Sequence, residues 1–282
     1  MLEISKTPGA MSSTLKCLRV LDVLANAPYQ FTLTELSEVL GLGKSTVHRF
    51  VTTLMAAGYV EQELLGKRYR IAKKALWIGS SYLRHSAIYR CGFSLLEELS
   101  RKTEAMSHLA VLDGESVLYL HTSGPPRSLN LFADSGERRP VHATALGKAM
   151  MACQPDSYVR QVFSRKCERY TPNTIVDFER MEEELQKVRR LGYAIDDEEG
   201  VLGLRCIAVA IRDGNEAAVA AISVSGSREK VTDESIPRLA YLVKEAALRI
   251  SVQLGYRPAT SNLDSLLGEY RAPLAGSADS GA

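Results

Sequence analysis

Apolar residues recur with helical spacing through the first sixty positions, and short polar breaks separate the stripes. Residues 12–25 carry the first stripe, which predicts a helix. Thr32 and Glu35 have the spacing of a capping box, in which the threonine caps the helix that follows and the glutamate caps in return. A second, short helix is therefore predicted up to Leu40.

The next break, Gly41-Leu42-Gly43, suits a tight turn because glycine adopts left-handed backbone conformations without strain. A third helix is predicted over residues 44–57, with Gly58 ending it. One side of this helix is apolar, and the opposite side carries hydrogen-bond donors and hydroxyls without an acidic residue. The apolar side comprises Val47, Phe50, Val51 and Leu54, and the polar side comprises Lys44, Ser45, Thr46, His48, Arg49 and Thr52.

Two short β-prone segments follow within residues 59–71, with Gly66 between them, and predict a small hairpin. Lys67 and Arg68 make its return strand basic. Three helices and such a hairpin form a winged helix-turn-helix, predicted over residues 12–73 with the helix-turn-helix at 32–51. The third helix is expected to enter the major groove of double-stranded DNA, and Lys67 and Arg68 to contact phosphates.

The charge distribution agrees with this prediction. Residues 1–90 contain 12 Lys and Arg against 6 Asp and Glu, whereas residues 91–282 contain 23 against 27. A basic end on an otherwise acidic chain is typical of a protein that binds a polyanion at that end.

Other protein classes are disfavoured by what the sequence lacks. No stretch approaches the ~18 consecutive apolar residues of a membrane span, and the first residues do not resemble a secretory signal. The five cysteines form an odd set without a C-x-x-C pair, which favours the reducing cytoplasm over a disulfide framework. Neither a nucleotide-binding loop nor a hydrolase or zinc-protease motif is present. We therefore expect no enzyme activity, no cofactor and no metal.

From Ser107 onward the apolar pattern shifts towards a period of two. Hairpins are predicted around Asp113-Gly114 and Asp213-Gly214, and helices near residues 143–152, 178–191 and 233–254. Antiparallel strands mixed with helices predict an α+β domain.

Two serines mark a candidate ligand pocket in this domain. Ser223 and Ser225 are two positions apart on an apolar strand, so both hydroxyls lie on one face and need partners if that face is buried. A bound carboxylate can supply those partners, and the free N–H groups where a helix opens near Ala145 also favour an anion. Asp196 can accept a hydrogen bond from a ligand hydroxyl, and Cys206 adds a small polarisable wall. The alternative is that the serines only satisfy neighbouring backbone groups.

Several motifs together resemble the IclR family of bacterial transcriptional regulators. They are Thr34-Glu35-Leu36-Ser37, the run from Gly41 to Arg49, Gly58-Tyr59-Val60, the run from Val141 to Ala149, Gly192 to Glu199, Gly203 to Ala208, and Ala221 to Gly226. The resemblance covers about residues 12–256. One departure is Ile71-Ala72, where the family usually has Leu-Gly.

This resemblance implies a linker helix over residues 74–90, through which members dimerise, and a GAF-like effector-binding domain over 91–257. It implies a regulator, more often a repressor, that controls catabolic genes in response to a small organic acid and acts as a homodimer or a dimer of dimers. The effector contacts of the family fall on Ala145 and Leu146 (through their backbone), Asp196, Cys206, Ser223 and Ser225. Residues 258–282, rich in Ala, Ser, Gly and Pro, are expected to form a flexible tail.

Two other functions stay open at this point. One is a GAF-like redox enzyme in which Cys206 is the nucleophile, and the other is a DNA-binding architectural module whose sensor domain binds nothing. A metal site built from His121, His142, Cys206 and Asp196 has no support from their spacing.

Overall fold

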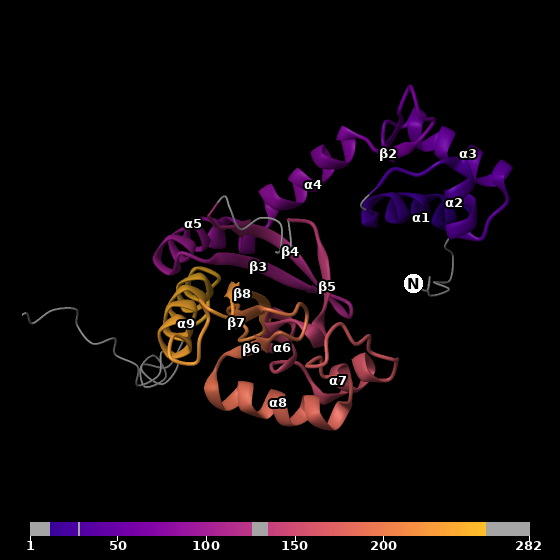
Figure 1. Cartoon of the computed structure of the whole chain (residues 1–282). Helices are drawn as coiled ribbons and strands as arrows, with labels where there is room; N and C mark the ends of the chain where they lie inside the picture. The colour runs from indigo at the N-terminus through magenta and orange to yellow at the C-terminus, as the bar shows by residue number, and fades with distance from the viewer. Residues whose placement is uncertain (1–11, 28, 126–134, 258–282) are drawn as a thin grey trace, which may run out of the picture. The chain divides into compact units, whose positions relative to one another are not determined.

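The computed structural model describes residues 12–27, 29–125 and 135–257. The chain divides into two compact units, Met1–His85 and Ser86–Ala282 (Figure 1). The predicted tail, residues 258–282, lies outside the described residues.

The N-terminal unit contains the predicted three helices and hairpin. The elements are α1 (Ser12–Asn26), α2 (Leu33–Leu40), α3 (Lys44–Ala56), β1 (Val60–Gln62) and β2 (Tyr69–Ile71). The capping box at α2 is confirmed: the Thr32 hydroxyl accepts a hydrogen bond from the Glu35 N–H at 3.3 Å, and Glu35 Oε2 accepts one from the Thr32 N–H at 2.7 Å. Gly41 has a φ of 64°, the left-handed conformation that the turn into α3 requires.

One small apolar core holds this unit together. Val20 from α1, Leu36 from α2 and Val47 and Val51 from α3 are almost fully buried in it. The predicted apolar side of α3 is thus confirmed, except that Phe50 is only half-buried at its edge. The packing leaves the opposite side of α3 free of any role in the core.

The predicted linker helix differs from the observed one. Helix α4 (Lys73–His85) ends before residue 90, and a separate helix, α5 (Ala87–Thr103), begins directly after Ser86. The cause is local, because the Ser86 side chain caps α5 by accepting a hydrogen bond from the Tyr89 N–H at 3.2 Å. No residue of α4 is buried.

A six-stranded antiparallel sheet forms the centre of the C-terminal unit, in the order β5-β4-β3-β8-β7-β6. Both predicted hairpins, β3–β4 and β7–β8, are present. The strands are β3 (Met106–Asp113), β4 (Ser116–Ser123), β5 (Arg138–Pro140), β6 (Ala194–Asp197), β7 (Leu204–Arg212) and β8 (Ala218–Ser227).

Helices cover both faces of this sheet (Figure 1). Helices α5 and α9 (Ile236–Gln253) pack together on one face, and α6 (Ala145–Met151), with α8 (Phe178–Leu191) and α7 (Asp156–Phe163) beyond it, lies on the other. Helix α8 has its predicted bounds. Helix α9 begins three residues later than predicted, because Thr232 and Ser235 hydrogen-bond each other's backbone N–H groups in the turn before it.

Helix α6 is preceded by a single 3-10 turn, Val141–Ala143, instead of beginning at Ala143 as predicted. Gly147 allows the two to pack closely: a Cβ at this position would lie 2.1 Å from the Val141 carbonyl oxygen. This contact packs the 3-10 turn directly against α6. Among the described residues, no helix is both long and apolar enough to cross a lipid bilayer.

Candidate DNA-binding face and ligand cavity

The polar side of α3 is exposed along its length. Lys44, Ser45, His48, Arg49 and Thr52 are exposed there, and Thr46 is half-buried. Their donors and hydroxyls match the groups that bind phosphate oxygens and base edges in a major groove. The structure therefore brings all six predicted α3 residues to one helix, five of them on its solvent side.

The wing, which is the β1–β2 hairpin and its loop, presents fewer free cations than its sequence indicates. Lys67 is exposed, with a left-handed φ of 48°. Arg68 instead folds back: its Nη1 donates to the Gln30 carbonyl at 2.7 Å and lies 3.3 Å from Glu35 Oε2. Because the Arg68 guanidinium ties the wing to the start of α2, the predicted phosphate contact fits Lys67 better than Arg68.

A cavity of about 230 Å³ lies between α6 and the face of the sheet that α6 covers. That volume is far larger than one water molecule needs. All six residues predicted as effector contacts line it: Ala145, Leu146, Asp196, Cys206, Ser223 and Ser225.

The register of the sheet explains how residues far apart in the sequence meet at this cavity. Asp196 on β6 pairs with Cys206 on β7, and Cys206 pairs with Ser225 on β8. Because paired residues of adjacent strands share a face, the three form one row across the sheet. Ser223 lies in the neighbouring row, opposite His108 on β3.

The two serine hydroxyls do not serve the backbone. The Ser225 hydroxyl donates to Cys206 Sγ at 3.0 Å. Ser223 is 1% exposed, and its hydroxyl makes no hydrogen bond to any described residue. Both serines line the cavity, and neither hydroxyl bonds to the backbone. This arrangement favours a ligand over the alternative in which the serines satisfy neighbouring backbone groups.

The cavity wall also includes residues that sequence patterns did not reveal. His108 is buried against the Thr122 hydroxyl, 3.1 Å away, and burial lowers its pKa to about 3, so its ring is neutral. Tyr119 packs edge-on to His108, and Arg139 pairs with Glu137 at 2.6 Å. These residues lie on β3, β4 and β5, and only strand pairing brings them to β8. Tyr170 and Thr144 also line the wall.

Asp196 and Cys206 have unusual electrostatic surroundings. Asp196 is 4% exposed, and its Oδ1 accepts a hydrogen bond from the Glu199 N–H at 2.8 Å. Burial, followed by the negative charge of Glu199, raises the pKa of Asp196 to about 7. Burial, followed by the negative charge of Asp196, raises the pKa of the Cys206 thiol well above its usual value. A thiol kept protonated is a poor nucleophile, which argues against redox catalysis at Cys206.

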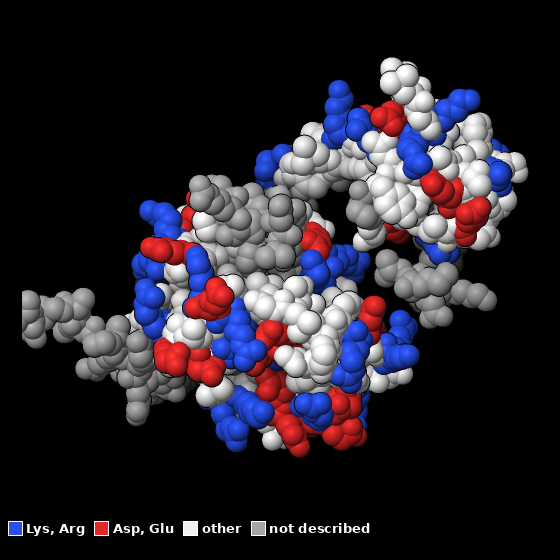
Figure 2. Space-filling view, in the orientation of Figure 1, with Lys and Arg blue, Asp and Glu red and all other residues white. Residues whose placement is uncertain are grey.

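The charges over the C-terminal unit are otherwise mixed. On the face seen in Figure 2, Lys and Arg are interspersed with Asp and Glu. Within the described part of the chain, no group of three or more His, Cys, Asp and Glu is placed to hold a metal ion.

An exposed polar helix in a winged helix-turn-helix, with a cavity of mixed apolar and polar lining in a separate α+β domain, defines a DNA-binding regulator with a ligand-binding domain. The chain belongs to the IclR family of transcriptional regulators: residues 13–64 match the IclR helix-turn-helix domain, and residues 80–252 match the bacterial transcriptional regulator IclR C-terminal domain. The predicted family and α+β fold are confirmed, and the family is not enzymatic.

Individual relatives match along most of the chain. It is 33% identical to the HTH-type transcriptional regulator KdgR of Escherichia coli K12, over 90% of this chain and 97% of that protein. It is 31% identical to the transcriptional repressor IclR of the same organism, over 88% and 91%. A crystallised IclR transcriptional regulator from Alicyclobacillus acidocaldarius has a TM-score of 0.78 at 26% identity, covering 87% of this chain and all of that one.

The raised pKa of Cys206 predicts an unreactive thiol. Because only the thiolate attacks a disulfide reagent, Cys206→Ser should leave the thiol signal of the native protein with Ellman's reagent at pH 8 unchanged. In denaturant, where every cysteine is accessible, Cys206→Ser should release one equivalent fewer of the reagent's thiolate per chain than the wild-type protein. Cys91→Ser, at a partly exposed position, is the matched control and should lower the native signal. A native signal that falls in Cys206→Ser would contradict the assignment.

Proposed function

We propose that this regulator is a cytoplasmic repressor of catabolic genes that binds a double-stranded operator through α3 and releases it when a small carboxylic acid occupies the cavity. The observation that carries the ligand half is the cavity itself, whose wall brings Ser223, Ser225 and Asp196 together from two strands. The repressor assignment follows the names of relatives such as the Escherichia coli repressor IclR.

In the DNA-bound state, α3 lies in the major groove. Arg49 and His48 are exposed on the helix and reach base edges, whereas Lys44, Ser45, Thr46 and Thr52 contact phosphates or neighbouring bases. Lys67 at the tip of the wing adds a phosphate contact that does not depend on sequence.

The operator is read by a homodimer formed through α4. Leu76, Trp77 and Tyr82 on this helix are 74%, 66% and 54% exposed in the single chain. Large apolar side chains gathered on one helix favour burial against a second copy. Two-fold symmetry then requires a pseudo-palindromic operator, and dimers can pair further into tetramers.

The effector is a small acid because the cavity combines a small volume with hydroxyl donors on an apolar wall. Ser223 donates to the carboxylate, and Ser225 does so by turning its one proton from Cys206 Sγ to the ligand. The backbone N–H groups of Ala145 and Leu146, which begin α6, complete the contact. The Leu146 side chain limits the size of the ligand. Binding changes operator affinity only insofar as the acid prefers one arrangement of the dimer over the other.

Substitutions on α3 and the wing separate base contacts from phosphate contacts. Arg49→Ala should cost about 1–3 kcal/mol of operator binding and relax preference at one base pair. Lys67→Ala should weaken all sequences equally and reduce the slope of log K against log salt by about one. Fluorescence anisotropy of labelled intergenic DNA from upstream of the gene, titrated with salt, measures both. Arg68→Ala is the control, because its guanidinium is already bonded to Gln30 and Glu35. A slope that changes in Arg68→Ala but not in Lys67→Ala would refute the wing assignment.

The same DNA assay tests the ligand when it is repeated with a panel of small carboxylic acids. Ser223→Ala should weaken the response to the active acid about tenfold, the value of one hydrogen bond to a charged group, without altering operator affinity in its absence. Ser107→Ala is a matched control: Ser107 is also buried with an unpartnered hydroxyl among the described residues, but it does not line the cavity. If no acid shifts operator binding, the ligand half of the proposal is wrong.

The dimer contact is tested by sedimentation velocity. Trp77→Ser combined with Leu76→Ser should shift the protein from dimer towards monomer at micromolar concentration. The reason is that the Trp77 and Leu76 side chains become buried when two chains associate. Leu202→Ser replaces a similarly exposed leucine, 63% exposed, in the C-terminal unit and should have no effect. A wild-type protein that sediments as a monomer would remove the basis for the α4 contact.

A further inference from the structure

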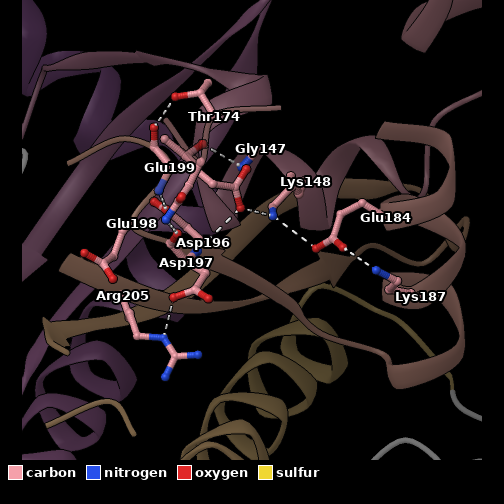
Figure 3. Close-up of polar contacts among 12 residues, drawn as sticks. Gly147, Lys148, Thr174, Glu184, Lys187, Asp196, Asp197, Glu198, Glu199 and Arg205 are labelled. Atoms are coloured by element: carbon pink, nitrogen blue, oxygen red, sulfur yellow. Dashed lines mark hydrogen bonds and ion pairs between the residues drawn. The ribbon is translucent and has the colours of Figure 1, made fainter. Parts of the chain in front are cut away.

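A single buried ammonium group lies among three carboxyl groups beside the cavity wall (Figure 3). Lys148 on α6 is 1% exposed; its Nζ donates to Glu199 Oε1 and, at 3.1 Å, to Glu184 Oε1 on α8. Exposed Lys187 lies 3.5 Å from the other oxygen of Glu184. Asp196 is the third carboxyl group, and no Lys or Arg among the described residues forms an ion pair with it.

The positive charge of Lys148 is therefore paired with Glu199 and Glu184 rather than with Asp196. Glu199 is 4% exposed, so its contact with Lys148 neutralises a carboxylate that has few other partners. Its second oxygen, Oε2, is buried without a hydrogen-bond partner among the described residues. Burial favours the neutral amine, but Glu199 and Glu184 outweigh it and raise the pKa of Lys148, so the ammonium persists. Asp196 is left as the buried carboxyl group without a cation of its own.

A buried carboxylate without its own cation takes up a proton rather than remain charged. The pKa of Asp196, raised to about 7 by burial and by Glu199, agrees with this geometry; Lys148 and the N–H groups of Glu199 and Gly200 offset only part of the rise.

The other titratable groups that line the cavity have shifted pKa values or lie in ion pairs. Burial keeps Cys206 on β7 and Tyr119 on β4 protonated, and Tyr170 in the loop before α8 likewise has a raised pKa. His108 on β3 is neutral. Arg138 and Arg139 on β5 are paired with Asp113 and Glu137. Asp196 is thus the cavity group, among those that the structure describes, whose charge changes around pH 7.

We propose that Asp196 holds the effector as a neutral carboxylic acid, donating its O–H to a carboxylate oxygen, and that Lys148 and Glu199 act as a positioning pair that withholds the buried positive charge from it. The inference rests on the proposed function, because it takes the cavity as the effector site. It changes the role expected from the sequence, in which Asp196 accepts a hydrogen bond from a ligand hydroxyl. It also restricts the effector to molecules whose carboxylate can face Asp196.

The affinity for an acid effector should therefore depend on pH. An anionic acid that binds only the protonated form keeps its full affinity below about pH 7 and loses it about tenfold per pH unit above. With a midpoint of about 7 in the free protein, binding takes up about 0.9 proton at pH 8 and about 0.1 at pH 6. An ionised Asp196 that accepts from a ligand hydroxyl gives the opposite result, with affinity rising as the pH increases.

The protonation state is tested first without a ligand. In protein labelled with ¹³C at the aspartate carboxyl carbons, the resonance lost in Asp196→Asn identifies Asp196, and its shift against pH gives the midpoint. We expect a midpoint near 7, lowered in Glu199→Gln because a negative charge is removed and Lys148 is freed. Glu184→Gln, which removes the other carboxylate on Lys148, is the control and should lower it less. A wild-type midpoint near 4 overturns the inference, whether or not either variant folds.

The complex is tested by calorimetry with propionate and benzoate at pH 8 in HEPES and Tris, whose ionisation enthalpies differ. Uptake of close to one proton supports the inference, and the uptake should disappear in Asp196→Asn, because the amide has no proton to gain. Binding without uptake, or with release, overturns it and leaves the proposed function standing. If the midpoint of the Asp196 titration is near 7 but neither these acids nor any acid of the panel binds, the proposed function fails. The role of Asp196 in holding an effector then fails with it.

Discussion

The pairing register of β6, β7 and β8 is the constraint on which the ligand site depends. It places Asp196, Cys206 and Ser225 in one row across three strands, with Ser223 in the next row on the same face. A shift of one residue in any of these pairings would turn its side chains to the opposite face, where α5 and α9 pack. Helix α6 covers this face of the sheet, and Gly147 allows the 3-10 turn Val141–Ala143 to pack closely against that helix.

The buried ion cluster connects this site to the helices around it. Lys148 joins α6 to Glu199, directly after β6, and to Glu184 on α8. Removing one partner of such a group leaves an uncompensated buried charge, so the cluster holds α6 in place as well as controlling the charge at Asp196. The Lys148 cluster thus acts on Asp196 from behind the cavity wall, whereas the two arginines that line the cavity, Arg138 and Arg139, pair with Asp113 and Glu137.

Much of this organisation could be predicted from the sequence, and the rest depends on tertiary contacts. The capping box at Thr32 and the two faces of α3 are local patterns, and the structure confirms them. Ser223 and Ser225 could be placed on one face from their spacing alone. His108 and Tyr119 could not be assigned to the cavity, because strand pairing brings them there. The contact of Arg68 with Gln30 could not be predicted either, because it spans 38 residues and has no local sequence pattern. The end of α4 was missed because a cap at Ser86 competes with a continuous helical pattern.

The central claim is that the cavity and α3 are coupled, so that the acid and the operator bind different arrangements of one protein. Coupling of this kind is reciprocal: the factor by which the acid weakens operator binding must equal the factor by which the operator weakens acid binding. The most direct measurement is calorimetric titration of the active acid into the protein, free and saturated with operator DNA. We predict a weaker acid affinity in the DNA complex, by the factor that anisotropy gives for the operator. Equal affinities in the two titrations would contradict it.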